Sequence, residues 1–362
     1  MVKRPLSIID DPDPCPAIPG WIGAKQVLTA KIKAIASYLP EGRLSNDDLA
    51  RLYPDWPADK ILEKTGVAQR SIAAPDETAG DLAANAARAL FDRHAVDPAS
   101  IDFLLFCTQT PDYILPTTAC VLQNRLGLRT DCGALDFNLG CSGFVYGLSL
   151  AKALIESGQA ARVLLLTADT YSKLIHPMDK SVRTLFGDGA AATLVEAVEA
   201  SVPAIDPVVF GTDGAGAENL IVPTGGFRRA RDADSAAPTT DASGNVRAAD
   251  HLYMNGPAIM TFTLKTVPAA ITQLLAKSGR TMEDHDLFVF HQANVFMLER
   301  LRQKLAIPAD RFVIRMRDCG NTVSSTIPIA LEPLLDKAGP PRRAMLVGFG
   351  VGYSWAATSV TL

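Results

Sequence analysis

Three residues of this 362-residue chain have types and settings suited to thioester chemistry: a cysteine, a histidine and an asparagine. Cys141 lies in the segment Leu-Gly-Cys-Ser-Gly, between an apolar run that predicts a buried strand and a stretch that predicts a helix. Glycines at 140 and 143 let the backbone turn sharply, and the free N–H groups of a helix start favour an anion. We therefore expect Cys141 to be a nucleophile with a lowered thiol pKa.

His291 and Asn321 are the two candidate partners of this cysteine. His291 ends the apolar run Asp-Leu-Phe-Val-Phe, and Asn321 lies in the small polar loop Cys-Gly-Asn-Thr-Val-Ser-Ser. Taken alone, each residue fits a structural role, as a satisfied histidine or a turn asparagine. Together with Cys141 they match thioester chemistry, because an imidazole and an amide can stabilise a developing thioester enolate.

The glycine-rich segment at 347–355 (VGFGVGYSW) predicts a fourth part of the site. Its glycines expose backbone N–H groups that could form an oxyanion hole with the backbone N–H of Cys141. It is not a dinucleotide-binding fingerprint, because the chain ends before the helix and the acidic residue that such a fingerprint requires.

Apolar runs alternate with helical stretches along most of the chain, which predicts an α/β protein with mostly parallel sheets. We expect an N-terminal arm at 1–27, one half at 28–200 that carries the cysteine, and a second half at 201–362 that carries the histidine and the asparagine. A polar, turn-rich surface loop is expected at 228–250. The expected strands are 31–38, 102–109, 134–139, 162–168, 190–196, 286–291, 344–349 and 354–362. The expected helices are 81–94, 117–126, 143–157, 257–278, 294–305 and 326–335.

Composition excludes several classes of protein. A net charge of −4 argues against a nucleic-acid binder, and 48% hydrophobic with 20% charged residues is typical of a globular enzyme. We find no secretory segment and no apolar stretch that approaches the length of a membrane span, and we expect a cytoplasmic protein. The six cysteines show no zinc spacing, so we expect reduced thiols and no metal.

Five ordered motifs make the chain closely resemble the β-ketoacyl-acyl-carrier-protein synthase III family of thiolase-like condensing enzymes. HQAN alone would be a weak signal, but the similarity runs from residue 31 to residue 362. The motifs are CSGFVYGLSLA from 141, FGDGAAA at 186–192, HQAN at 291–294, GNTVSSTIP at 320–328 and GFGVGYSW at 348–355.

The resemblance implies a five-layered αβαβα fold of two pseudo-equivalent halves and an obligate homodimer. Cys141 would take an acyl group from a thioester. His291 and Asn321 would then activate a malonyl group on acyl carrier protein, and the backbone at Cys141 and Val351 would bind the oxyanion. Acyl thioesters of coenzyme A or carrier protein would be substrates, with no bound cofactor. Asp188, in FGDGA, would have a structural role.

The resemblance also indicates an altered substrate entrance. Lys60 and Lys180 align with the family's tryptophan and arginine that enclose adenine, and Lys64 aligns with an arginine that grips phosphate and pantetheine. Phe296 replaces a carrier-docking arginine, and Leu115 replaces the aromatic residue that caps the acyl pocket from the partner subunit. We therefore expect a carrier-loaded starter that is of medium chain length or branched. The implied substrate-binding set also includes Asn294 and Gly256, and Arg300 with Lys304 is the expected carrier-docking pair.

Four alternative functions share some of these features. A papain-like cysteine hydrolase has its catalytic residues in the same order, Cys, His, Asn. This chain, however, shows no secretory segment and does not have the residues that surround the cysteine of that family. A non-catalytic relative would not keep the three residues, and a thiolase would need a second cysteine near the C-terminal glycines. A relative that transfers the acyl group to another nucleophile in secondary metabolism stays open, as does the identity of the starter.

Overall fold

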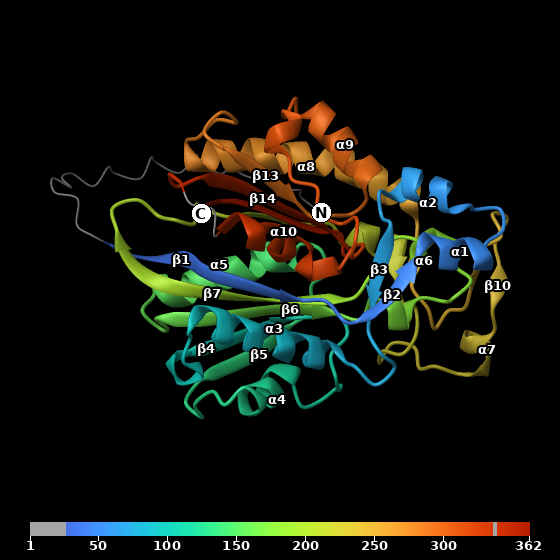
Figure 1. Cartoon of the computed structure of the whole chain (residues 1–362), viewed down its shortest axis with the longest axis horizontal. Helices are drawn as coiled ribbons and strands as arrows, with labels where there is room; N and C mark the ends of the chain where they lie inside the picture. Colours follow the sequence, from blue (N-terminus) through green and yellow to red (C-terminus); the bar gives the residue numbers. More distant parts are fainter. Residues whose placement is uncertain (1–26, 336–338) are drawn as a thin grey trace, which may run out of the picture.

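A computed structural model of the chain describes residues 27–335 and 339–362, so the expected arm at 1–27 lies almost wholly outside the described residues. The first half of the described chain forms a five-stranded mixed sheet (Figure 1). β4 lies parallel to β5 and β6, whereas β7 pairs antiparallel with both β6 and β1. The strands, in sheet order, are β1 (Val27–Tyr38), β7 (Gly189–Ala200), β6 (Arg162–Asp169), β4 (Phe103–Cys107) and β5 (Gly133–Phe137).

A second sheet of four strands comes from the rest of the chain. Only β13 and β14 are parallel, because β14 returns directly into β15 and β8 joins the edge antiparallel. The expectation of mostly parallel sheets is therefore wrong: strands that follow each other through a short turn must pair antiparallel. The strands, in order, are β13 (Leu287–Phe290), β14 (Arg343–Gly350), β15 (Ser354–Thr361) and β8 (Val209–Thr212).

Helices cover the outer face of each sheet and fill the space between the sheets, giving the five layers that the family resemblance implies (Figure 1). The central pair begins directly after the cysteine loop and the asparagine loop, so it positions both. The outer helices are α3 (Ala79–His94) and α4 (Thr118–Arg125) on the first sheet, and α8 (Gly256–Ser278) and α9 (Val295–Lys304) on the second. The central helices are α5 (Gly143–Glu156) and α10 (Thr326–Leu335).

The central layer shares one hydrophobic core with both sheets. Phe144 and Leu148 of α5 pack in the same cluster as Leu165 of the first sheet and Leu346 of the second. Each of these four side chains is fully buried. Burying a Leu or Phe side chain stabilises a fold by about 1.5–3 kcal/mol, so this shared cluster binds the two halves firmly together.

Helix α8 is 23 residues long and apolar enough, by length and composition, to cross a membrane, with a mean hydropathy of 1.3. The expectation that no apolar stretch approaches this length is therefore wrong. Within residues 27–335 and 339–362 it is the one helix that meets both criteria. Its buried side chains, among them Phe262 and Ile271, pack in the core against the second sheet, which is the setting of a core helix.

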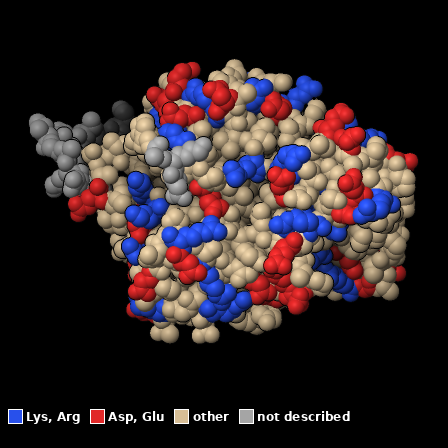
Figure 2. All heavy atoms as spheres, in the orientation of Figure 1, with Lys and Arg blue, Asp and Glu red and all other residues tan. Residues whose placement is uncertain are grey.

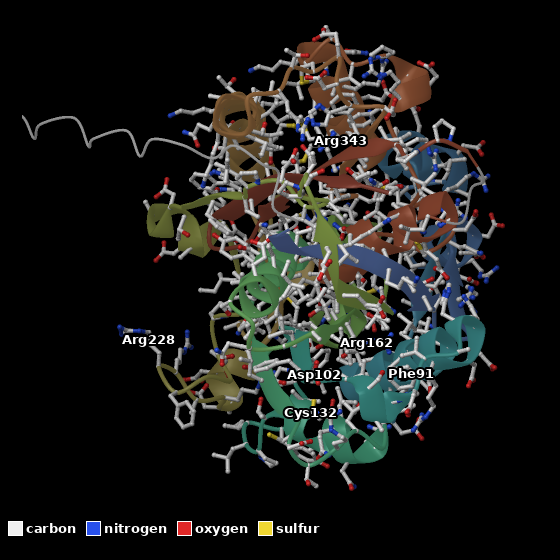
Figure 3. All side chains as sticks on the ribbon, turned by 90° about the vertical axis from the view of Figure 1, so that its left-hand side faces the viewer. Phe91, Asp102, Cys132, Arg162, Arg228 and Arg343 are labelled. Atoms are coloured by element: carbon white, nitrogen blue, oxygen red, sulfur yellow. The ribbon has the colours of Figure 1, made fainter. Side chains whose placement is uncertain are left out.

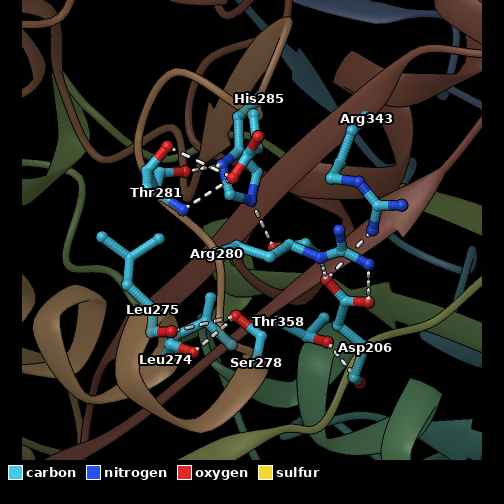
Figure 4. Close-up of polar contacts among 11 residues, drawn as sticks. Asp206, Leu274, Leu275, Ser278, Arg280, Thr281, His285, Arg343 and Thr358 are labelled. Carbon is cyan, nitrogen blue, oxygen red and sulfur yellow. Dashed lines mark hydrogen bonds and ion pairs between the residues drawn. The ribbon is translucent and has the colours of Figure 1, made fainter.

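Polar contacts tie the end of α8 to the second sheet (Figure 4). The buried carboxylate of Asp206 accepts hydrogen bonds from Arg280 Nε at 2.6 Å and from Arg343 Nη1 at 3.0 Å. His285, which is fully buried, places its Nε2 2.7 Å from Ser359 Oγ. Both groups are satisfied within this network, so we assign them a structural role.

The segments that frame the entrance were largely missed by the sequence prediction. Residues 42–72 form a two-stranded sheet and two short helices: β2 (Gly42–Ser45), α1 (Asn46–Leu52), α2 (Ala58–Thr65) and β3 (Gln69–Ile72). The expected loop at 228–250 is exposed, and Arg228 projects from it (Figure 3), but it also contains short elements. The remaining short elements are α6 (Lys180–Arg183), β9 (Leu220–Ile221), α7 (Ala233–Ala236), β10 (Thr239–Thr240), β11 (Val246–Arg247) and β12 (Tyr253–Met254).

Charges of both signs are interspersed over the face shown in Figure 2. Blue and red side chains neighbour each other there, without a broad patch of one sign. This distribution gives that face no extended basic surface of the kind that binds a nucleic-acid backbone.

Candidate active site

Cys141 lies in the sharp turn between β5 and α5. The N–H of Gly143 donates to the carbonyl of Gly140 at 2.8 Å and closes the turn. A Cβ at Gly143 would lie 2.2 Å from the sulfur of Cys107, and a Cβ at Gly140 would lie 2.5 Å from Gln109 Oε1. The two glycines are therefore required for close packing as well as for the turn.

The thiol of Cys141 is 5% exposed, and this burial raises its pKa above the ordinary value. The carboxyl group of Asp169 raises the pKa further, whereas the backbone N–H of Cys141 lowers it without offsetting the other two effects. The expectation of a lowered pKa is wrong here because desolvation outweighs the helix start. The thiol is protonated at neutral pH, so acyl transfer must remove its proton.

Asp169 is a buried carboxyl group close to this nucleophile that the sequence analysis missed. It is fully buried at the end of β6, and burial raises the pKa of Asp169 to about 7. Its Oδ1 accepts a hydrogen bond from the backbone N–H of Gln109 at 2.8 Å, and its Oδ2 accepts one from Ser324 Oγ at 2.5 Å. It thereby links the first sheet to the loop that carries Asn321.

His291 follows β13, and its backbone N–H donates to the carbonyl of Val347 at 2.8 Å. The ring meets that of Phe349 edge-on, with 5.5 Å between centroids, and its Nδ1 lies 2.8 Å from Thr326 Oγ1. His291 is 2% exposed, and burial lowers its pKa to about 3. The imidazole is therefore neutral at physiological pH.

Asn321 is fixed through both its backbone and its side chain. Its backbone N–H donates to the carbonyl of Leu185 at 2.9 Å, and its carbonyl accepts from Gly187 N–H at 3.0 Å. The side-chain Oδ1 accepts from the backbone N–H of Val323 at 2.9 Å, which directs Nδ2 toward His291 Nε2 at 3.5 Å. The FGDGA segment thus positions the asparagine loop.

Asp188 has the structural role that the sequence predicts. Its buried carboxyl group accepts hydrogen bonds from the backbone N–H groups of Ala73 at 2.8 Å and Ser172 at 2.9 Å. A buried carboxyl group with two backbone donors anchors the surrounding loops. It lies beside Gly187 in the chain and so helps to hold the segment that pairs with Asn321.

One cavity of about 290 Å³ brings Cys141, His291 and Asn321 together. Cys141 follows β5 of the first sheet, His291 follows β13 of the second sheet, and Asn321 lies in the loop before α10, yet all three share this space with Phe349 and Gly350. We call these five residues the cavity floor. The other lining residues are Trp56, Lys64, Thr65, Ser181, Thr184, Leu185, Phe186, Leu220, Met254, Gly256, Ile259, Met260, Ala293, Asn294, Phe296 and Met297.

Glycines leave open space beside the nucleophile. A Cβ at Gly350 would lie 3.0 Å from the sulfur of Cys141, and a Cβ at Gly348 would lie 2.8 Å from its carbonyl oxygen. Val351 packs against Gly140, with 2.9 Å between Val351 Cγ1 and the position of a Cβ there, but Val351 does not line the cavity. The oxyanion role of its backbone stays a proposal.

Only some of the expected substrate-binding residues line the cavity. Lys64, Phe296, Asn294 and Gly256 line the cavity, as expected, whereas Lys60, Lys180 and Leu115 do not. The side chain of Leu115 is 79% exposed, so it contributes nothing to the cavity of its own subunit. Arg300 lies over the ring of Phe296 at 5.2 Å, and Lys304 Nζ donates to the carbonyl of Leu264 at 2.8 Å.

Trp56 is a second residue that the sequence analysis missed. It lines the cavity, and the ammonium of Lys60 lies 5.2 Å from its ring centroid. We call Trp56, Lys64 and Phe296 the cavity mouth, because Lys64 and Phe296 are exposed and Trp56 is half-buried. The one sequence feature that could have indicated Trp56 is the Asp-Trp-Pro turn, in which the tryptophan stands four residues before Lys60. Nothing in the spacing of this turn indicates a ligand-binding residue.

Comparison with known proteins agrees with this geometry. The family models for 3-oxoacyl-[acyl-carrier-protein] synthase III and for its C-terminal part match residues 135–214 and 275–362. A β-ketoacyl-[acyl-carrier-protein] synthase III of Neisseria meningitidis is 35% identical over 331 residues, 91% of this chain and 98% of the relative.

Solved structures agree as well. A crystal structure of a 3-oxoacyl-(acyl-carrier-protein) synthase III is 60% identical with a TM-score of 0.91, covering 92% of this chain and 100% of the other. A 3-oxoacyl-(acyl-carrier-protein) synthase from Burkholderia xenovorans is 37% identical with a TM-score of 0.84, over 93% and 95% of the two chains. The chain therefore belongs to the β-ketoacyl-[acyl-carrier-protein] synthase III family.

Proposed function

We propose that the chain catalyses the decarboxylative condensation of an acyl thioester with a malonyl-carrier thioester, in fatty-acid or related lipid biosynthesis. The product is a 3-oxoacyl thioester that is two carbons longer than the starter. The observation that carries the proposal is the single cavity in which a thiol, a neutral imidazole and an amide N–H converge. Those groups are what the two half-reactions need.

In the first half-reaction the sulfur of Cys141 attacks the acyl thioester carbonyl. A new carbon–sulfur bond forms, the old one breaks, and the thiol proton leaves on the departing thiol. Because the pKa of Cys141 is raised, this proton stays on sulfur until attack begins. The space left by Gly350 accommodates the acyl group beside the sulfur.

In the second half-reaction malonyl-carrier loses carbon dioxide. The resulting enolate oxygen accepts hydrogen bonds from His291 and Asn321, and its carbon attacks the acyl carbonyl on Cys141. The tetrahedral oxyanion meets the backbone N–H groups of Cys141 and Val351, and collapse releases the Cys141 thiolate, which takes up a proton. Preorganised donors of this kind each contribute about 2.7–4 kcal/mol.

The working assembly is proposed to be a cytoplasmic homodimer without a metal or cofactor. Leu115, Ile114 and Phe227 are 79%, 77% and 95% exposed, and Ile114 and Phe227 line one surface cleft. Large apolar side chains exposed together indicate a protein interface. We propose that the partner subunit covers them and that Leu115 reaches the acyl pocket of that partner.

The carrier protein is proposed to dock beside the cavity mouth. Arg300 and Lys304 lie one turn apart on α9, the helix that carries Phe296. Acidic carriers favour such cations, which raise the rate of association more than they raise affinity. Contact with α9 would deliver the carrier's thioester into the cavity between Phe296 and Lys64.

The test is a reaction with acyl-coenzyme A and malonyl-carrier, followed by mass spectrometry of enzyme and carrier. We expect an acyl adduct on Cys141 and then a 3-oxoacyl carrier with stoichiometric carbon dioxide. An acyl adduct that moves to an added amine or alcohol without release of carbon dioxide would instead favour the acyltransferase alternative. Hydrolysis of peptide substrates would favour the papain-like alternative.

A further inference from the structure

Ser142 is a serine at the start of a helix that does not cap the helix. It follows Cys141 directly and is the N-cap residue of α5, yet its side chain makes no capping hydrogen bond. A serine at this position ordinarily accepts one from the second or third N–H of its helix. Ser142 has φ of −87° and ψ of −12°, which is helical rather than the extended conformation of a capping serine. Its hydroxyl is therefore available to a partner outside α5.

The partner of this hydroxyl belongs to the other half of the chain. Ser142 Oγ lies 2.6 Å from the Oγ of Ser354, the first residue of β15, which is 212 residues away. The exposed fractions of the two serines are 0% and 4%. Among the described residues, Ser354 is the only hydrogen-bond partner of Ser142 Oγ. The contact joins the turn that carries Cys141 to the glycine-rich segment at 347–355.

The hydroxyl of Ser354 also holds the backbone of the glycine-rich segment. It donates to the carbonyl of Val351 at 3.0 Å. A serine hydroxyl has one hydrogen, and a carbonyl oxygen only accepts. Both contacts are therefore hydrogen bonds at once when Ser142 donates to the oxygen of Ser354. One hydroxyl then accepts from the first half of the chain and donates to the second.

Val351 is held on both sides by this arrangement. It lies in the short connection between β14 and β15. The residue before it, Gly350, pairs with Ser354 in the sheet, and its own carbonyl accepts from the Ser354 hydroxyl. A backbone that is bonded on both sides has little freedom to turn its N–H away from the site.

The backbone N–H groups of Cys141 and Val351 are available to a ligand. Neither of them donates to a backbone carbonyl within the part of the chain that the structure describes. The turn and the glycine-rich segment also approach each other closely, because a Cβ at Gly348 would lie 2.7 Å from Ser142 Cα. Free backbone donors of this kind, brought together by packing, are the usual components of an oxyanion hole.

An oxyanion hole is effective only when its donors point at the same oxygen, and each half of this chain supplies one of them. We propose that Ser142 and Ser354 are positioning residues that hold the N–H groups of Cys141 and Val351 in a fixed relation, as one oxyanion hole. Neither serine lines the cavity, so both act through the backbone. The inference rests on the proposed function, which assigns the tetrahedral oxyanion to these two N–H groups.

The main test is Ser354→Ala, which removes the donor to Val351 and the acceptor of Ser142. Both half-reactions pass through a tetrahedral oxyanion, so we expect acylation and condensation each to be about 10-fold slower at saturating substrate. KM should stay within about 2-fold of wild type. The loss is smaller than the 10²–10³-fold effect of removing an oxyanion donor, because the N–H groups remain and are only less well fixed.

Three further variants test whether the two serines act as a unit. Ser142→Ala leaves the bond from Ser354 to Val351 intact, so it should slow both half-reactions by only about 3-fold. The double variant should be no slower than Ser354→Ala alone, because coupled residues are not additive. Ser354→Thr keeps the hydroxyl and should react within about 2-fold of wild type.

Alkylation of Cys141 by iodoacetamide separates positioning of the oxyanion hole from a general disturbance of the turn. The sulfur forms a bond to a saturated carbon, iodide leaves, and the thiol proton goes to water, so no carbonyl oxygen gains charge. We expect Ser354→Ala to be alkylated at Cys141 within about 2-fold of the wild-type rate, although acyl thioesters acylate it about 10-fold more slowly. Mass spectrometry of the enzyme measures both rates.

The matched control is Ser359→Ala. Ser359 lies on the same strand, is fully buried, and has its hydroxyl 2.7 Å from His285 Nε2. Five positions along β15, about 17 Å, separate it from Ser354. The variant loses a comparable buried hydrogen bond, so it should be less stable in a denaturant titration. It should nevertheless be acylated and alkylated like wild type.

Three results would overturn the inference. These are acylation of Ser354→Ala at the wild-type rate, an equal fall in its alkylation and acylation, or additive losses in the double variant. Failure of the proposed condensation gives a different pattern, because wild type itself would then acylate without forming a 3-oxoacyl product. The comparison of acylation with alkylation would still decide the role of the two serines in that case.

Discussion

The cavity floor and the cavity mouth differ in how their side chains are held. At the floor, Cys141, His291 and Asn321 are at most 5% exposed and are fixed by packing or by hydrogen bonds from both halves of the chain. At the mouth, Lys64 and Phe296 are exposed, and among the described residues the only charged group near the Lys64 ammonium is that of Glu63, at 3.9 Å.

This difference shows where precision and adaptability are needed. A reaction centre loses rate when its groups move by a fraction of an ångström, so it is built on buried and bonded residues. Replacing an exposed side chain at an entrance costs little stability, because such a side chain makes few contacts. The floor should therefore control chemistry, and the mouth should control which thioesters enter.

The largest expected effect is at the nucleophile. Cys141→Ala should form no acyl-enzyme and should lose at least about 10³-fold in condensation, because no other described group in the cavity is a thiol. Intact mass and product assays measure both. Cys120→Ala, at an exposed cysteine of α4, is the matched control and should behave like wild type. Condensation by Cys141→Ala near the wild-type rate would remove the distinction between floor and mouth.

The second prediction divides the floor itself. His291→Ala and Asn321→Ala should still acylate Cys141, because acyl transfer does not require the enolate donors. They should lose about 10²–10³-fold in decarboxylative condensation, the usual effect of removing one oxyanion donor. Single-turnover acylation and carbon dioxide release measure the two steps. If either variant blocks self-acylation as fully as Cys141→Ala, the roles are wrong and a hydrolase-like ion pair is favoured.

The third prediction concerns the starter. We expect hexanoyl thioesters to acylate Cys141 several-fold faster than acetyl thioesters, because each buried methylene contributes about 0.8 kcal/mol and Leu115 is smaller than a ring. Leu115→Phe should shift the preference back toward acetyl. The two starters compete, each offered on coenzyme A and on carrier protein, and mass spectrometry of the enzyme identifies the acyl group on Cys141. A strong preference for acetyl-coenzyme A would show that residues 60, 115 and 180 do not have the meaning assigned to them.

The fourth prediction concerns the mouth. Trp56 offers an aromatic face to an entering thioester, so Trp56→Ala should raise KM for acyl-coenzyme A by about 3–10-fold, the range of one aromatic contact. The turnover number should stay the same, because the floor is untouched. Trp56→Phe should recover most of the loss. A fall in kcat with constant KM would place Trp56 in the chemistry and contradict the comparison.

The smallest effect concerns stability and pH. The pKa of Asp169 is raised to about 7 in the fold, against about 3.9 in an unfolded chain, so the folded state binds the extra proton between these values. The stability associated with this protonated carboxyl group is fully present below pH 3.9 and is lost as the pH rises to 7. Between pH 5 and 7, the unfolding free energy of wild type should therefore fall more steeply than that of Asp169→Asn. The difference in slope should be on the order of 1 kcal/mol per pH unit. Equal slopes in denaturant titrations would contradict this.

The sequence was most informative where residue type and local geometry coincide. The five-layered fold was predicted from the motifs, and most strands and helices were predicted to within a few residues from periodicity. The structure brings Cys141, His291 and Asn321 into one cavity, as expected. The sheet directions were wrong because pairing across space is not encoded in the apolar pattern of a single strand.

The remaining parts of the site depend on three-dimensional proximity. The pKa of Cys141 is raised by burial, which a motif at a helix start does not reveal. Asp169 and Thr326 meet the site only through contacts between distant segments, 155 residues apart for Asp169 and Ser324. Trp56 lies beside Lys60 on a short turn, where exposed side chains follow no periodic pattern.

The shared central layer has a consequence for synthesis of the chain. When the ribosome has released residues 27–200, helix α5 lies on the first sheet, but its other face still lacks the second sheet that buries it. A nascent chain in that state presents an apolar surface to the solvent until α10 and β14 emerge. Such surfaces attract chaperones and promote aggregation. The first half alone therefore leaves this apolar face of α5 uncovered, and the segments that carry α10 and β14 are needed to bury it.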